Sequence, residues 1–149
     1  MKGQTAVEYL MTYGWAILII LIVAGVLAYY GIFAPAGFLG PTARGFGQVQ
    51  VLSPWSLATT GTLTINVENR VGGTINMTQL NISSDEGDFG VDISPQVQIA
   101  SGEKRVVQGT FTGLPSHITG DSYSLTLTMY YTYVGQTFSS TGTLSGTYT

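Results

Sequence analysis

The feature that most constrains this chain is an uninterrupted apolar segment near its N-terminus. Residues 9–43 contain no charged residue, and residues 15–33 are almost wholly apolar. About 20 apolar residues in a helix suffice to cross the hydrocarbon core of a bilayer. A helix also satisfies its own backbone groups within lipid. We therefore expect one hydrophobic helix over residues 4–33, with Gly31 and Pro35 as its stop signals.

Behind this helix the sequence pattern changes twice. Residues 34–48 are rich in Gly and Pro, which predicts a linker. Apolar and polar residues then alternate, most regularly over residues 122–134, as is typical of strands with one buried and one solvated face. This alternation predicts that Leu125, Leu127 and Met129 are buried. Strands are expected over residues 49–52, 62–67, 75–83, 97–100, 105–111, 122–134 and 136–148.

The order of these elements predicts the fold class. A long hydrophobic helix followed by about seven short antiparallel strands indicates an α+β chain. Its head domain, residues 49–149, is expected to be an immunoglobulin-like β-sandwich, because the strands are short and separated by turn residues. The pairing order of the strands does not follow from the pattern.

The composition excludes several classes of function. Only 9% of the residues are charged, the net charge is −3, and the five basic residues are scattered. Nucleic-acid binding relies on clustered basic residues, so no nucleic-acid partner is expected. The chain has no cysteine, which excludes a disulfide framework and a thiolate metal site. Motifs for a serine nucleophile, a zinc site or a phosphate loop are missing, so we expect neither an enzyme nor a cofactor.

The acidic residues and the single histidine are the candidate metal ligands of this chain. Asp85, Glu86, Asp88 and Asp92 form the only acidic cluster. Oxygen ligands in a flexible loop suit Ca²⁺, but the spacing does not match an EF-hand. A solvated turn without metal is therefore expected. His117 has no nucleophile or metal ligand near it in sequence and is interpreted as a loop residue.

Two sequons for N-glycosylation lie close together. They begin at Asn76, in the triplet Asn76-Met77-Thr78, and at Asn81, in the triplet Asn81-Ile82-Ser83. The functional interpretation predicts exposed glycans on Asn76 and Asn81. The alternative is that the triplets arise by chance, because the sequence is rich in Thr.

Three kinds of segment contain a helix this apolar: a signal anchor, a cleaved secretory signal and the assembly helix of a filament. Lys2 and the small residues 34–36 fit a secretory signal. The apolar run, however, is longer than the roughly 7–15 residues of such a signal, and Glu8 lies at its edge. A plain anchor tolerates Glu8 at a membrane interface but gives no reason for it.

The N-terminus, with Lys2-Gly3-Gln4, then Glu8, then the apolar run, resembles the class III signal sequence of archaeal type IV pilins. The resemblance covers about 33 residues closely. It implies that a prepilin peptidase cleaves after Gly3, so that residues 1–3 are a signal segment and the mature chain begins at Gln4. Glu8 is then the fifth residue, where the family has a glutamate. Bacterial pilins usually begin with a methylated phenylalanine, and Gln4 matches the archaeal version instead.

The resemblance implies a structural role. The chain would be inserted in the membrane as a precursor and then polymerised by pilus assembly machinery into a filament of identical subunits on the cell surface, used for adhesion. Cleavage would remove Lys2 and create an α-amine on Gln4. That amine can pair with Glu8 of the same or a neighbouring subunit and fix the axial register, since a carboxylate in an apolar setting needs a partner. Two alternatives remain: a membrane-anchored β-domain that binds a surface partner as a monomer, and a subunit of the archaellum.

Overall fold

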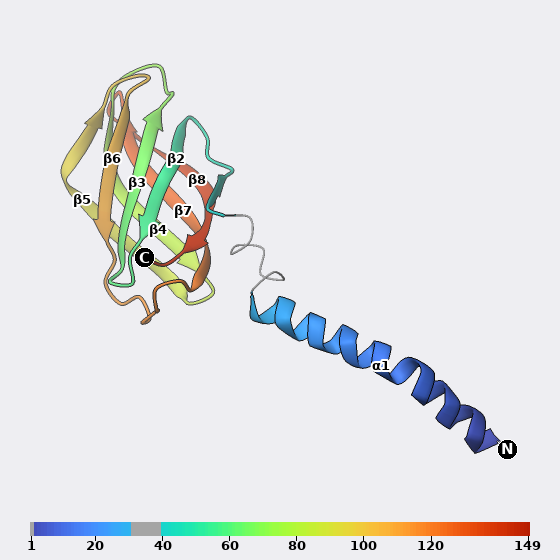
Figure 1. The fold of residues 1–149 in the computed structure, drawn as a ribbon. Helices are drawn as coiled ribbons and strands as arrows, with labels where there is room; N and C mark the ends of the chain where they lie inside the picture. The colour runs from blue at the N-terminus through green and yellow to red at the C-terminus, as the bar shows by residue number, and fades with distance from the viewer. Residues whose placement is uncertain (1, 31–39) are drawn as a thin grey trace.

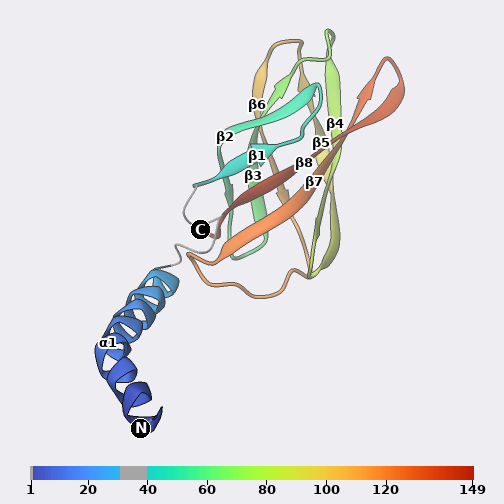
Figure 2. The same cartoon turned by 90° about the vertical axis from the view of Figure 1, so that its right-hand side faces the viewer.

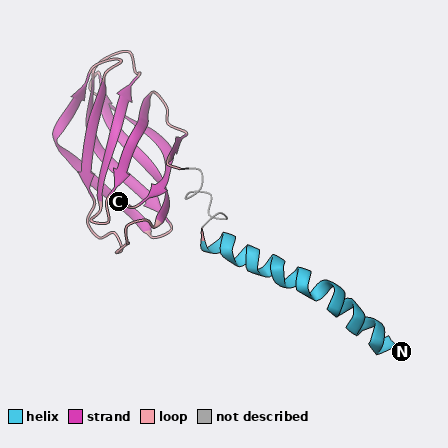
Figure 3. Ribbon diagram, viewed as in Figure 1, coloured by secondary structure: helices cyan, strands magenta, loops and turns pink. Residues whose placement is uncertain are grey.

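The computed structural model describes residues 2–30 and 40–149 and contains one helix and one β-rich head (Figure 1). The helix α1 spans Lys2–Tyr29. The head holds eight antiparallel strands in two sheets, and Figure 3 shows that no helix interrupts them. The chain is therefore α+β, as the sequence predicts.

The composition of α1 explains why it is a helix of this length. Leu, Ile, Ala and Val dominate it, and no proline interrupts it, so every backbone N–H beyond the first turn finds its carbonyl. The last bond runs from the N–H of Tyr30 to the carbonyl of Val26, at 3.0 Å. The predicted end of the helix at residue 33 and the first part of the predicted linker lie outside the described residues.

Most strands of the head follow one another with short connections, and the longest connection, residues 111–121, joins β6 to β7. A five-stranded sheet has the order β1-β8-β7-β4-β5, and a three-stranded sheet has the order β2-β3-β6 (Figure 2). The strands are β1 (Thr42–Arg44), β2 (Val49–Leu57), β3 (Thr62–Asn69), β4 (Ile75–Ser84), β5 (Gly87–Ile99), β6 (Lys104–Thr110), β7 (Ser122–Tyr133) and β8 (Gln136–Thr147).

The core lies between the two sheets and follows from the alternation in the sequence. Leu125, Leu127 and Met129 of β7 are buried, which confirms the predicted facing of this strand. All buried hydrophobic residues of the core lie between Val49 and Tyr148 in the sequence, and none of them belongs to α1. A domain with a hydrophobic core of its own can fold alone, so residues 40–149 form an independent folding unit.

The predicted linker is wrong at its C-terminal end. Residues 42–44 form β1, which pairs with β8 through Thr42↔Ser145 and Arg44↔Thr143. The buried hydroxyl of Ser140 then holds the next segment to β8: it accepts from the N–H of Gly47 at 3.0 Å and donates to the carbonyl of Val49 at 2.7 Å. These contacts make residues 42–48 part of the head.

Several strand boundaries also differ from the prediction: β2 continues to Leu57 instead of ending at residue 52, and β5 begins at Gly87 instead of residue 97. The solvated turn expected at the acidic cluster is only two residues long, because β5 begins at Gly87 and pairs with β4 from Ser84↔Gly87 onward. At the other end of the sheet, Val134 does not continue β7. It has φ of 49° and precedes Gly135 with φ of 75°, and two positive φ values in succession are typical of a type I′ hairpin turn.

Candidate functional site

The helix α1 has apolar side chains on all of its sides, and the structure gives them no cover. Between Gly3 and Tyr30 every residue is exposed or half-exposed; Leu10, Ile20 and Leu21, for example, are each 64–65% accessible. The most apolar 18-residue window within Gly3–Tyr29 has a mean hydropathy of 2.4. A helix that is apolar all round normally lies in a membrane or in a bundle of helices. By length and composition α1 can cross a membrane, although a signal sequence near an N-terminus has the same properties.

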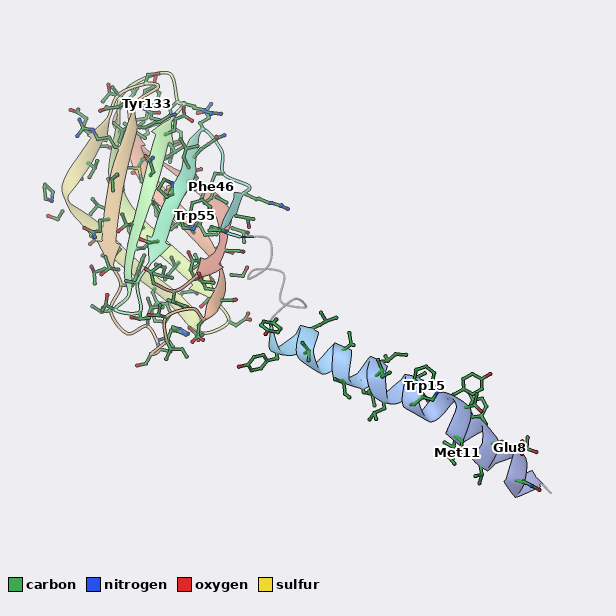
Figure 4. All side chains as sticks on the ribbon, viewed as in Figure 1. Glu8, Met11, Trp15, Phe46, Trp55 and Tyr133 are labelled. Carbon is green, nitrogen blue, oxygen red and sulfur yellow. The ribbon has the colours of Figure 1, made fainter. Side chains whose placement is uncertain are left out.

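The processing residues Gly3 and Gln4 and the proposed register residue Glu8 lie near the start of this helix. Gly3 and Gln4 are exposed in its first turn. Glu8, which is labelled in Figure 4, is exposed one turn later. Residues four apart on a helix are neighbours on one face. The backbone of Gln4 and the carboxylate of Glu8 therefore lie on the same side, which is the arrangement that pairing between a Gln4 amine and Glu8 requires.

Tyrosine pairs mark the two ends of α1. The rings of Tyr9 and Tyr13 have centroids 4.7 Å apart, and those of Tyr29 and Tyr30 have centroids 5.7 Å apart with an edge-to-face orientation. Tyr and Trp gather at the two interfaces of a membrane, where an apolar ring and a polar tip are both accommodated. The positions fit a helix whose middle is the most apolar part.

Comparison with known proteins adds no relative. The chain matches no known protein family, and no curated protein is similar to it at a significant level.

The sequon asparagines lie on β4, a central strand of the five-stranded sheet. Asn76 and Asn81 are half-buried, so both side chains are less exposed than predicted. The reason is the position of β4 between β5 and β7, whose side chains crowd it from both sides. The side-chain oxygen of Asn81 is buried without a hydrogen-bond partner, and a Cβ on Gly90 would come within 2.8 Å of it. Glycosylation stays a prediction.

The acidic residues do not form a ligand cluster. Asp85 and Glu86 make the β4–β5 turn, whereas Asp88 and Asp92 are spread along β5. In the part of the chain that the structure describes, no group of three or more carboxylate or histidine side chains is placed to hold a metal ion. The predicted solvated turn therefore contains only Asp85 and Glu86.

His117 has partners that its sequence neighbourhood did not indicate. It lies in the loop between β6 and β7, as expected, and its Nε2 is 3.1 Å from Oε2 of Glu86. Its Nδ1 is 4.0 Å from the Asp121 carboxylate, and its ring stacks on Tyr148 with centroids 4.1 Å apart. Burial, and after it the charge of Glu86, raises the pKa of Tyr148. The cluster fastens the loop to the C-terminal end of the chain.

Proposed function

We propose that this chain is a structural subunit of an archaeal type IV pilus-like surface filament and polymerises through α1. The observation that carries the proposal is an exposed helix that is apolar on every side, with Glu8 one turn behind the Gly3–Gln4 bond. An independent two-sheet head, proposed to be an immunoglobulin-like sandwich, fits the part of such a subunit that stays outside the filament core. Adhesion is the proposed use of the filament.

The physical argument concerns where α1 can be stable. Burial of a Leu or Ile side chain contributes about 1.5–3 kcal/mol, and α1 has many such side chains in water-accessible positions. The lipid bilayer provides one apolar environment, and a bundle of identical helices provides another. Assembly is then the transfer of α1 from the first to the second.

Glu8 is the residue that distinguishes the bundle from a simple anchor. At a membrane interface its carboxylate reaches water or head groups. In a bundle it is surrounded by apolar helices, so without a partner it would take up a proton or lose several kcal/mol of hydration energy. The amine that cleavage creates on Gln4 can supply that partner, and a pair between subunits selects one axial register.

The first experiment tests processing and assembly together. N-terminal sequencing of filaments sheared from cells that express the chain should begin at Gln4. A chain that begins at Met1 or Gly37, or a protein that forms no filament under the electron microscope, contradicts the proposal and favours a monomeric anchored domain.

The second experiment tests the role of Glu8. Glu8→Gln keeps the size and removes the charge, and we expect membrane insertion and cleavage to persist while filament yield falls sharply. Glu8→Asp should be intermediate because the charge remains but its reach is shorter. The matched control is Thr12→Ala, a polar position one turn further along the same face, which should assemble normally. Normal filament yield from Glu8→Gln would remove the register argument. Filament width and helical symmetry would separate a pilus from an archaellum.

A further inference from the structure

The outer side of the five-stranded sheet lacks the charges that a solvent-exposed surface normally has. Its three central strands, β4, β7 and β8, contain no Asp, Glu, Lys or Arg over their whole lengths. Serine and threonine hydroxyls point outward instead, and we call this surface the hydroxyl face; its members include Ser124, Thr126, Thr128, Thr141, Thr143 and Ser145. Depletion of charge at the centre of a surface is typical of the core of a protein–protein interface.

Charged residues return at the two edges of this face, and their signs are opposite. The register places Arg44 of β1 beside Thr143, which pairs with Thr126. Thr126 in turn pairs with Ser83, which pairs with Asp88 of β5. One row across the sheet therefore runs from a guanidinium through three hydroxyls to a carboxylate. Cross-strand partners share a side of the sheet, so all five side chains belong to the hydroxyl face.

These edge charges have no partner inside the head. Arg44 and Asp88 are both exposed. The salt bridges found within residues 40–149 use Glu68, Arg70, Glu86, Glu103, Arg105, His117 and Asp121. Asp92, four residues after Asp88 on the same side of β5, is likewise outside these pairs. The hydroxyl face therefore has an uncharged centre between two edges that carry unpaired charges of opposite sign. Such a surface is complementary to a second copy of itself.

We propose that the hydroxyl face binds the hydroxyl face of a second copy of this chain. A two-fold axis in the contact plane and parallel to the strands brings Arg44 of each copy opposite Asp88 of the other. Thr126, in the middle of the row, then lies near the axis. Such an isologous contact uses the same patch on both partners, and both ion pairs form at once.

The size of the face sets the strength of the contact. Five strands span four intervals of about 4.8 Å, and the rows from Ser145 to Thr137 extend over roughly 27 Å, which gives roughly 500 Å² on each copy. A total of about 1,000 Å² lies at the small end of specific interfaces. One pair of heads should therefore associate weakly, and an array of many heads should bind strongly through multivalency.

The symmetry of the contact determines which heads it can join. This step rests on the proposed function. Subunits whose helices point the same way around a common filament core have no two-fold axis through their heads. The hydroxyl face therefore joins heads of two different filaments and bundles them side by side. Asn81 lies on this face, paired with Thr128, so a glycan at Asn81 and pairing of the face exclude one another.

The test uses the head alone, residues 40–149, produced without glycans and studied by sedimentation velocity from micromolar to millimolar concentration. We expect reversible dimers. Thr141→Lys places two charges in the contact and should weaken the dimer about tenfold or more. The matched control is Thr110→Lys. Thr110 is also exposed and its hydroxyl is 3.1 Å from that of Thr62 on the other sheet, just as the Thr141 hydroxyl is 3.0 Å from that of Thr128. This control should dimerise like the parent.

A charge exchange tests the orientation of the two copies. Arg44→Glu and Asp88→Arg should each weaken the dimer, because each creates two like-charge contacts. The double variant restores both pairs with their signs reversed and should dimerise like the parent. Equal thermal melting of all variants checks that the head stays folded, and Thr126→Lys replaces Thr141→Lys if that variant melts early.

Three results overturn the proposal: a head that stays monomeric at millimolar concentration, equal weakening of the dimer by Thr110→Lys and Thr141→Lys, or no recovery in the double variant. Because the fragment lacks α1, these results are independent of filament assembly. If the head dimerises but the full chain forms no filament, the hydroxyl-face contact stands and the proposed function fails.

Discussion

Asn69 offers a quantitative test of how the two sheets are held together. It ends β3, its side chain is fully buried, and its amide makes three hydrogen bonds. Nδ2 donates to the carbonyls of Gly73, at 2.7 Å, and Ile99, at 2.9 Å, while Oδ1 accepts from the N–H of Val71, at 2.9 Å. Because β3 belongs to one sheet and Ile99 to the other, the side-chain amide of Asn69 links the two sheets. The same amide also holds the β3–β4 connection in place.

The predicted effect of Asn69→Ala follows from these bonds. Each contributes about 1 kcal/mol net, and the change leaves a buried carbonyl without a donor, so the free energy of unfolding should fall by about 3 kcal/mol. With an m value of about 1.5 kcal/mol/M in urea, the unfolding midpoint should fall by about 2 M. For a head of this size the melting temperature should fall by about 12 °C.

Urea unfolding of residues 40–149, followed by tyrosine and tryptophan fluorescence, measures this effect. The matched control is Asn66→Ala, three residues earlier on β3, where the half-buried amide makes no side-chain hydrogen bond within the described head. The free energy of unfolding of this variant should differ from that of the parent by less than about 0.5 kcal/mol. If both alanine variants unfold at the same urea concentration, the amide of Asn69 does not hold the sheets and the argument fails.

The head allows two further predictions. Leu127→Asp introduces a charge into a site with no exposure and should leave the head unfolded, whereas Thr126→Asp, its exposed neighbour, should not; cooperative melting of the Leu127 variant would show that the facing of β7 is wrong. Hydrogen bonds from the Ala100 N–H and from Arg105 lower the pKa of Glu103 from its ordinary value of 4.5, so its contribution to stability is complete above that value and is lost as the pH falls through the lower, folded-state pKa. Acidification from about pH 6 to pH 3 should therefore destabilise the parent head more than Glu103→Gln, and parallel losses in both proteins would contradict this assignment.

The elements with strong periodicity could be predicted from the sequence. The helix could be predicted because residues 15–30 are almost all apolar, and such a run is stable only as a helix in an apolar environment. The facing of β7 was predicted because twelve residues alternate regularly. In both cases the deciding information is local, since the burial of each side chain follows from its position in a repeating pattern.

The misses share a physical cause, which is dependence on distant residues. The segment Thr42-Ala43-Arg44 lies between glycines and becomes a strand only because β8, about a hundred residues later, offers an edge. Asp88 and Gly90 are poor strand formers, yet β4 pairs with them. Likewise Glu86 meets His117 across 31 residues of sequence. The edge charges Arg44 and Asp88 could not be placed on one face until the strand order was known.

The attachment of residues 40–49 to β8 also has a mechanical consequence. A pulling force that reaches the head through the chain at Gly40 acts first on β1 and then on the hydrogen bond between Gly47 and Ser140. Only after these contacts break does tension reach Val49, where β2 begins and the second Ser140 bond lies. Under load β1 can therefore detach from β8 and release several residues of extended chain, while the core that surrounds Leu127 stays folded.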